Sequence, residues 1–355
     1  MEHTLTETLS ALQLLPLQIT LQAQTPIQLP RYKGSALRGG FGAVFKETVC
    51  IVEHRDCARC LLRARCAYPY VFDTPVPDGA TRMRKYEAAP HPFVILPPLE
   101  RKTSYQPGET LTFGWTLIGK GADYLPYFIY AFERLGERYG LGKGRGRFLV
   151  ESVCWLTPED EPTVIYRGAE KTLQSTFRLL NVHELAGQTA AGLGDSLTLR
   201  FLTPTRLVYG GSLSDSLHFH VLLRVLLRRL SNLSYFHCGT DLQLDFRGLI
   251  AAAEQVQTVS SHLRWYDWER YSSRQDARMK LGGFLGRVTY TGDLQPFLPL
   301  LWLGSYVHVG KATSFGLGKY VIEAGQEASS WSESLRDKRA PGATDGSGCD
   351  ATRQY

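Results

Sequence analysis

His308-Val-Gly-Lys-Ala-Thr-Ser-Phe-Gly-Leu-Gly-Lys319 is the most informative stretch of this 355-residue chain. It sets glycines and lysines between a predicted helix and a predicted final strand, at Gly310, Lys311, Gly316, Gly318 and Lys319. Glycine adopts positive φ angles and lets backbone N–H groups approach a phosphate closely. The order differs from that of a P-loop, because the lysine follows the first glycine. The stretch therefore predicts either a phosphate-binding loop or a tight turn before a strand.

The elements before this stretch form an ordered series. The clearest is an amphipathic helix over 215–233, with one apolar stripe at Phe219, Leu222, Leu223, Leu226, Leu230 and Leu233. The others are predicted as a strand over 196–203, strands over 263–271 and 284–290, a proline-interrupted helix over 294–303, and a strand over 315–323. An extra helical stretch over 246–259 is inserted in this series. An earlier part of the chain has the same order, with strands over 15–23, 93–99, 109–119 and 147–155 and helices over 34–49 and 123–139.

Both series have the order βαββαβ, which is that of a ferredoxin-like unit. We therefore predict an α+β fold class with two tandem ferredoxin-like (RRM-like) domains. The first domain is placed at 1–195, with a cysteine-rich insertion at 50–66, and the second at 196–325, with the glycine-rich loop. Residues 326–355 are rich in small and charged side chains, so we expect a disordered tail.

The composition is that of a globular protein. Hydrophobic residues make up 43% and charged residues 21%, which excludes wholesale disorder. No uninterrupted run of about 18 apolar residues is present, and the first residues do not resemble a signal peptide. We expect a cytoplasmic protein with no membrane partner. A formal net charge of +6 admits a polyanionic partner without proving one.

Four cysteines fall within seventeen residues, at Cys50, Cys57, Cys60 and Cys66. Their spacing is C-x6-C-x2-C-x5-C, and the central C-x2-C lets two thiolates reach one ion. In a reducing compartment this pattern favours a bound metal over disulfides. Zinc as a structural clip is the favoured ion, an iron–sulfur cluster fits the same ligands, and unliganded thiols are the third interpretation.

Three further stretches complete a family resemblance. They are Leu29-Pro-Arg-Tyr-Lys-Gly-Ser-Ala-Leu-Arg-Gly-Gly-Phe-Gly42, Leu141-Gly-Lys-Gly-Arg-Gly-Arg-Phe148 and Trp265-Tyr-Asp-Trp-Glu-Arg-Tyr-Ser-Ser-Arg-Gln275. Together with the glycine-rich loop, they make residues 10–325 resemble the RAMP superfamily, and within it the CRISPR precursor-RNA processing endoribonucleases. The resemblance implies cleavage of repeat RNA without a catalytic cofactor. The 2′-hydroxyl attacks the adjacent phosphate, leaving a 2′,3′-cyclic phosphate and a 5′-hydroxyl on mature guide crRNA. Implied partners are repeat RNA and crRNA, and other CRISPR effector or adaptation proteins.

The catalytic residues are less plainly marked. Many family members carry a histidine on the first helix, and here 34–49 contains none. We predict His308 as acid or base and Lys311 as a stabiliser of phosphorane-like charge, with Tyr32 and Arg38 as further catalytic candidates. The competing interpretation is that His308 only packs at a helix end.

RNA contacts are predicted at cations and loop glycines: Lys33, Lys46, Lys143, Arg145, Arg147, Arg270, Arg274, Gly310, Gly316, Gly318 and Lys319. Arg38 and Lys46 share one helical face, and Arg270 and Arg274 alternate with aromatic side chains, which suits contacts to single-stranded RNA. A solvated helix face and core packing of the aromatics are the competing interpretations. Two other functions stay open, a non-catalytic guide-RNA-binding subunit of a CRISPR effector complex and an unrelated α+β metal-binding protein.

Overall fold

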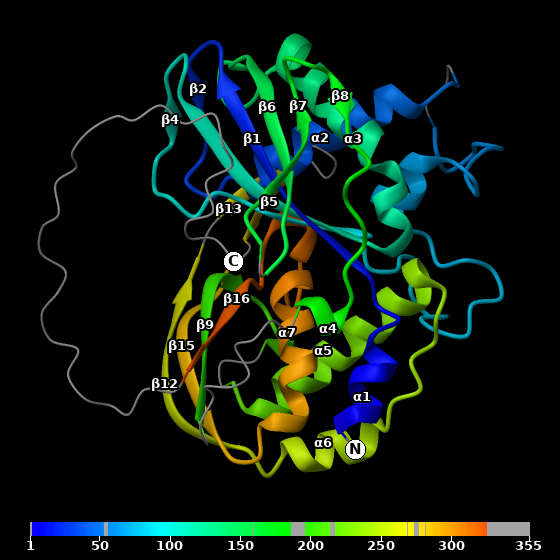
Figure 1. The fold of residues 1–355 in the computed structure, drawn as a ribbon, viewed down its shortest axis with the longest axis vertical. Coiled ribbons are helices and arrows are strands. Elements are labelled where there is room, and N and C mark those ends of the chain that lie inside the picture. The colour runs from blue at the N-terminus through cyan, green and yellow to red at the C-terminus, as the bar shows by residue number, and fades with distance from the viewer. Residues whose placement is uncertain are drawn as a thin grey trace, which may run out of the picture.

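The computed structural model describes residues 2–52, 56–158, 160–185, 196–213, 217–267, 269–272, 277–280 and 282–324. Figure 1 shows two α+β units, one above the other, each with a sheet and helices packed on it. The sheet orders are β3-β5-β1-β6-β7-β8 and β12-β15-β9-β16. The four strands of the ferredoxin-like unit are β1, β3, β5 and β6 in the first sheet and β9, β12, β15 and β16 in the second. In each sheet the first and third of these strands are neighbours at the centre, and all pairs are antiparallel. This is the ferredoxin-like order, so the predicted fold class is confirmed.

The first sheet contains β1 (Leu14–Ala23), β3 (Phe93–Leu96), β5 (Thr110–Ile118), β6 (Phe148–Trp155), β7 (Thr163–Arg167) and β8 (Thr172–Leu173), and β2 (Ile27–Gln28) pairs with β4 (Ser104–Tyr105) beside it. Helices α2 (Gly34–Val49) and α3 (Leu125–Arg134) pack together. Phe41 on α2 lies at the centre of the core, with its ring 4.8 Å from Trp115 and 5.3 Å from Phe132. Apolar side chains on one face of α2 are thus buried against the strands, as the helical periodicity predicts.

The second sheet contains β9 (Ser196–Thr205), β12 (Gln257–Tyr266), β15 (Gly283–Thr291) and β16 (Tyr320–Ala324), with short hairpins β10 (Val208–Tyr209)–β11 (Ser212–Leu213) and β13 (Glu269–Ser272)–β14 (Ala277–Lys280). Its helices are α5 (Phe219–Leu233), α6 (Phe246–Ala253) and α7 (Leu298–Val307). The whole predicted stripe of α5 is buried. Short 3₁₀ or π-helical turns lie at Pro69–Asp73, Gly119–Tyr124, Leu135–Tyr139, Ser234–Cys238, Gln295–Phe297 and Thr313–Phe315.

Some boundaries differ from the sequence prediction. Helix α6 ends at Ala253, not at 259, and β12 begins at Gln257. Strand β16 begins at Tyr320, not at 315, because Thr313–Phe315 forms a helical turn and Gly316 and Gly318 have positive φ angles that end it. The predicted tail, 326–355, lies outside the described residues.

The N-terminal segment packs with the second domain, which the boundary at 195 did not anticipate. Leu5, Leu9 and Leu12 are buried in the same apolar core as α5 and α7. Helix α1 (Glu2–Leu9) contacts α7, and so does α4 (Val182–Leu185). Figure 1 shows α1 at the lower end of the molecule, beside these helices. The chain therefore begins in the second core before β1 enters the first sheet.

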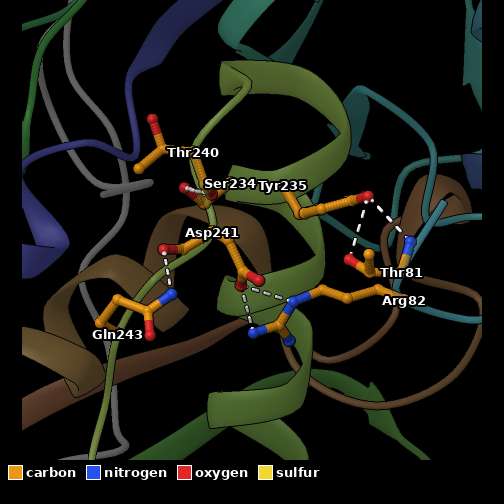
Figure 2. A network of polar contacts seen from close by, with 7 residues as sticks. All are labelled: Thr81, Arg82, Ser234, Tyr235, Thr240, Asp241 and Gln243. Atoms are coloured by element: carbon orange, nitrogen blue, oxygen red, sulfur yellow. Dashed lines mark hydrogen bonds and ion pairs between the residues drawn. The ribbon is translucent and has the colours of Figure 1, made fainter.

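The two domains are joined by polar contacts as well as apolar ones. Figure 2 shows the Tyr235 hydroxyl accepting hydrogen bonds from the Thr81 N–H, at 3.0 Å, and from the Thr81 hydroxyl, at 3.2 Å. Nearby, the Arg82 guanidinium forms an ion pair with Asp241 at 2.5 Å. Deeper in the interface, the His237 imidazole contacts the Tyr70 hydroxyl at 3.1 Å and Pro90 O at 2.7 Å. These contacts fix one domain against the other.

Among the described residues, none of the helices combines the length and the apolar character needed to cross a bilayer.

Candidate functional site

The glycine-rich loop is tightly packed between α7 and β16. A Cβ on Gly318 would lie 1.9 Å from Val309 O, and one on Gly316 would lie 2.2 Å from the Pro97 ring. The N–H groups of Gly316 and Gly318 donate to Thr313 O and Pro204 O. These two N–H groups are therefore already bonded within the protein. This favours the interpretation of the loop as a tight turn.

His308 lies inside the second domain. Its side chain is 2% exposed, and Nδ1 bonds Leu317 O at 3.1 Å. Burial, with the charges of Lys319 and Arg229, holds its pKa well below the ordinary value, so the imidazole is neutral. The Arg229 guanidinium in turn donates to His308 O at 2.9 Å. These are the contacts of a residue that shapes the loop, and the imidazole does not face solvent.

The two lysines of the loop have opposite environments. Lys319 is 2% exposed, and its ammonium donates to Ser305 O at 3.1 Å. Burial lowers its pKa to about 8. Lys311 is exposed at the tip of the loop, where its backbone N–H donates to Arg206 O. Of this pair, only Lys311 can meet a phosphate from solvent.

The loop rests directly on the start of α2, so the two predicted catalytic regions do meet. The Tyr32 hydroxyl donates to Phe315 O at 3.0 Å. The Arg38 guanidinium bonds the Ser314 hydroxyl through Nε at 3.1 Å and stacks 4.3 Å from the centre of the Phe315 ring. Gly34 permits this approach, because a Cβ there would lie 1.9 Å from Phe315 O. The structure thus brings Tyr32, Arg38 and the loop together across the domain interface.

His91 belongs to the same junction and was missed from the sequence, where it reads as a loop residue between two prolines. Its Nε2 lies 3.2 Å from the Arg38 guanidinium and its Nδ1 lies 2.9 Å from the Thr74 hydroxyl. Burial and the charge of Arg38 lower its pKa to about 3. Because Arg38 can only donate, Nε2 is the acceptor and Nδ1 carries the proton. No local sequence signal marks this role, since its partner Arg38 is 53 residues away.

The other predicted RNA-binding cations are scattered. Lys33 is fully buried, with its ammonium 2.9 Å from Glu100 O, and Lys46 lies over the Tyr68 ring at 5.3 Å. Lys143 and Arg145 are exposed in a turn of the first domain. The half-buried Arg147 bonds Glu137 O. Arg270 lies in β13 with its side chain outside the described part of the structure, and Arg274 lies outside the described residues altogether.

The cysteines predicted as metal ligands are close but do not form a coordination shell. Cys50, Cys57, Cys60 and Cys66 line one pocket at the end of α2. Within the described residues, no group of three or more His, Cys, Asp or Glu side chains is close enough to hold an ion. The nearby His54, which the sequence offers as a weaker alternative to His308 or as a metal ligand, falls outside the described residues.

Comparison with known proteins finds a family model that matches the second domain. Residues 199–320, which include the whole glycine-rich loop, match the family model of the CRISPR-associated endoribonuclease Cas6. Residues 12–177 match a separate family model described as an N-terminal domain. An uncharacterized protein of Archaeoglobus fulgidus is 24% identical over 298 residues, which cover 83% of this chain and 93% of the relative.

Solved structures agree on the fold. A Thermus thermophilus Cas6 product complex has a TM-score of 0.52 at 17% identity, covering 88% of this chain and 99% of that one. A partial Cas6-RT-Cas1–Cas2 complex has a TM-score of 0.55 at 15% identity, covering 92% of this chain and 48% of that one. The resemblance to CRISPR-associated RAMP-type processing endoribonucleases is confirmed. The unrelated metal-binding protein is thereby set aside.

The sheet of the second domain has a basic open face that the sequence prediction missed. His262, Arg287 and Arg200 are paired across β12, β15 and β9, so they share one face. Their neighbours along the strands, Leu199 and Val288, are buried on the opposite, helix-covered face. Arg200 and Arg287 both pair with Glu323 on β16. The signal that could have revealed this face is the alternation of polar and apolar residues along β9, β12 and β15. The sequence prediction considered the aromatic-rich stretch 265–275 instead.

Proposed function

We propose that this protein is an endoribonuclease that cleaves CRISPR repeat RNA within precursor transcripts to give mature guide crRNAs. The observation that carries the proposal is the Cas6 match over residues 199–320. The paired ferredoxin-like domains support it, because a solved Cas6 product complex shares this architecture over nearly its whole length. The junction of α2 and the glycine-rich loop is the proposed active site.

We propose that cleavage uses no metal ion. The 2′-hydroxyl oxygen attacks the adjacent phosphorus, the P–O5′ bond breaks, and the products end in a 2′,3′-cyclic phosphate and a 5′-hydroxyl. One proton leaves the 2′-oxygen and one is delivered to the 5′-oxygen. Side-chain cations around the phosphate then stabilise the charge that develops in the transition state.

The structure suggests how the predicted catalytic residues divide this work. Arg38 and the exposed Lys311 supply positive charge at the junction. Burial raises the pKa of Tyr32 well above its usual range, and its hydroxyl donates its one proton to Phe315 O, so we assign Tyr32 to holding the loop on α2. His308 becomes a positioning residue, because its buried imidazole bonds Leu317 O and holds the loop.

We propose repeat RNA and crRNA as partners, bound in part on the basic face of the second sheet. RRM-type sheets bind unpaired bases and phosphates on their open face. Here Arg200, Arg264 and Arg287 line that face, because Arg264 lies two residues after His262 along β12. CRISPR adaptation or effector proteins are proposed as further partners, since one similar structure is a Cas6-RT-Cas1–Cas2 complex. The cytoplasm remains the expected compartment.

The decisive experiment is cleavage of labelled repeat RNA from the host CRISPR array in EDTA. A matched RNA carries a 2′-deoxy substitution at the cut position. We expect cleavage of the first RNA only, with a cyclic-phosphate end. Tight binding without cleavage would overturn the enzyme and indicate a guide-RNA-binding subunit, whereas cleavage that requires a divalent cation would overturn the mechanism.

Lys311→Ala tests the junction itself. The side chain is exposed, so its removal leaves the packing of the loop intact. We expect slower cleavage with RNA affinity within a few-fold of the unmodified protein. Lys120→Ala, at another exposed lysine, is the matched control and should cleave normally.

A further inference from the structure

We propose that Cys50, Cys57, Cys60 and Cys66 form a structural zinc site. The ion would hold residues 50–66, the cysteine-rich excursion that follows α2, against the end of this helix. The four side chains come from three separate places in this segment and line a single pocket, together with Tyr68 and other neighbours. The inference concerns the stability of the first domain and does not depend on the proposed RNA cleavage.

The excursion has no apolar core to hold it. None of its described residues between 50 and 66 is buried. Its large apolar side chains face solvent, with Ile51 83% and Leu61 93% exposed. Small units that bury little apolar surface are commonly held by a cross-link or a metal, and this segment has the same deficit.

The two ends of the segment are already anchored. The Cys50 N–H bonds Lys46 O at 3.0 Å, at the end of α2, and Cys66 O accepts from the Tyr70 N–H at 3.3 Å, at the start of the next helical turn. Cys57 and Cys60 lie in the free part between them. A single ion bound to all four sulfurs would therefore join the free part to both anchors.

The chemistry of the pocket suits zinc. Thiolates are the preferred ligands of structural zinc, and the ion binds four of them tetrahedrally with loss of four thiol protons to solvent. The resulting complex carries two net negative charges, and Lys46 and Arg63 from the same pocket wall offset them. The thiols line the pocket without meeting at one point, so zinc binding requires the Cys57–Cys60 part to move toward Cys50 and Cys66.

Metal content of the full chain, purified without oxygen or added metal, tests the proposal. We expect about one zinc per chain, as for a four-thiolate structural site. Cys57→Ser and Cys60→Ser should each lose the zinc, and Cys238→Ser, which changes a partly buried cysteine outside the segment, should keep it. An unmodified protein without zinc, or a Cys57→Ser/Cys60→Ser variant that keeps it, would overturn the site.

A second measurement does not require a folded variant. Arg59, Arg63 and Arg65 are exposed side chains in this segment. If zinc holds the backbone of the segment in place, chelation of the unmodified protein should speed trypsin cleavage at these arginines, and added zinc should slow it again. Unchanged trypsin cleavage on zinc removal would overturn the clip. Iron with a visible absorption band, in place of zinc, would overturn the choice of metal and indicate an iron–sulfur cluster.

Discussion

At the scale of single residues, the charge of Arg38 is held in an unusual setting. Its guanidinium touches Ser314 from the glycine-rich loop and His91 from the first domain, and it stacks on Phe315. A guanidinium held by a hydrogen bond on each side has a fixed direction, which a lysine in its place would lose. Arg38 is therefore the cation of this site whose geometry matters most.

Arg38→Gln should slow repeat-RNA cleavage by about 100-fold, the usual effect of removing one preorganised donor from a charged transition state. Arg38→Lys should retain part of the rate, because it keeps the charge. Single-turnover cleavage with saturating protein measures the chemical step, and RNA affinity should change only a few-fold. Arg84→Gln, on an exposed loop, is the control. Full activity of Arg38→Gln would exclude this arginine from catalysis.

At the scale of elements, the contact between α2 and the glycine-rich loop depends on a missing side chain. Gly34 is the first residue of α2, and a Cβ on it would lie 1.9 Å from Phe315 O. Gly39 lies on the same helix, and a Cβ there would have no atom within 4 Å. The two glycines thus have different reasons to be glycine. Only the first permits a close approach between domains.

Gly34→Ala should therefore destabilise the protein by about 1–3 kcal/mol, as overpacking does. Gly39→Ala should stabilise it by about 0.5–1 kcal/mol, because alanine is the better helix former. Urea denaturation of both variants against the unmodified protein measures the difference. Equal effects of the two substitutions would show that the loop does not press on α2 in solution.

The open face of the second sheet is the other element with a predicted function. Arg264 and Arg287 are both exposed there. Replacing both with Gln should weaken RNA binding and reduce the slope of log affinity against log salt by about 1.4, the effect of two lost phosphate contacts on single-stranded RNA. Arg167→Gln, on the first sheet, is the control. An unchanged slope in the double variant would place the RNA elsewhere.

At the scale of the whole molecule, the buried His237 and the partly buried His91 lie where the domains meet. His237 from the second domain contacts Tyr70 and Pro90 O of the first, and burial lowers its pKa to about 4. His91 supports Arg38 at the loop, and burial with the Arg38 charge lowers its pKa to about 3. Both imidazoles are neutral in the folded protein at neutral pH. At the interface, both histidines therefore stay unprotonated until the pH is well below neutral.

This arrangement predicts acid sensitivity. A histidine whose pKa is lowered by folding takes up its proton first in the unfolded chain, so stability is fully present above the unfolded pKa of about 6.5 and falls as the pH drops below it. Each histidine should cost about 2 kcal/mol between pH 7 and pH 5. Denaturant unfolding across this range measures the loss.

Variants separate this effect from general acid denaturation. His237→Gln should be less stable than the unmodified protein at neutral pH, with a shallower decline toward acid pH. His183→Gln, at an exposed histidine, should change neither quantity. An equally steep decline in the His237→Gln variant would show that this histidine does not control the acid response.

The order and type of the main elements could be predicted from local patterns in the sequence. The stripe of α5 and the apolar face of α2 could be predicted from the spacing of apolar residues, because each helix must bury one side. Together with the predicted strands, these helices indicated the βαββαβ order. The same local signals located the glycine-rich loop and the four cysteines, whose chemistry is carried by residue type. Those features could be predicted because the residues involved are neighbours in the chain.

Only the tertiary structure decided which of the candidate residues face solvent. Lys33, His308 and Lys319 are buried, while Lys311 is exposed and Arg38 bonds Ser314, which is 276 residues away. It also placed α1 in the second core and His91 beside Arg38. Burial and pairing over such distances depend on how the two sheets and their helices pack, and a local stretch of sequence does not record which distant residue will lie beside it.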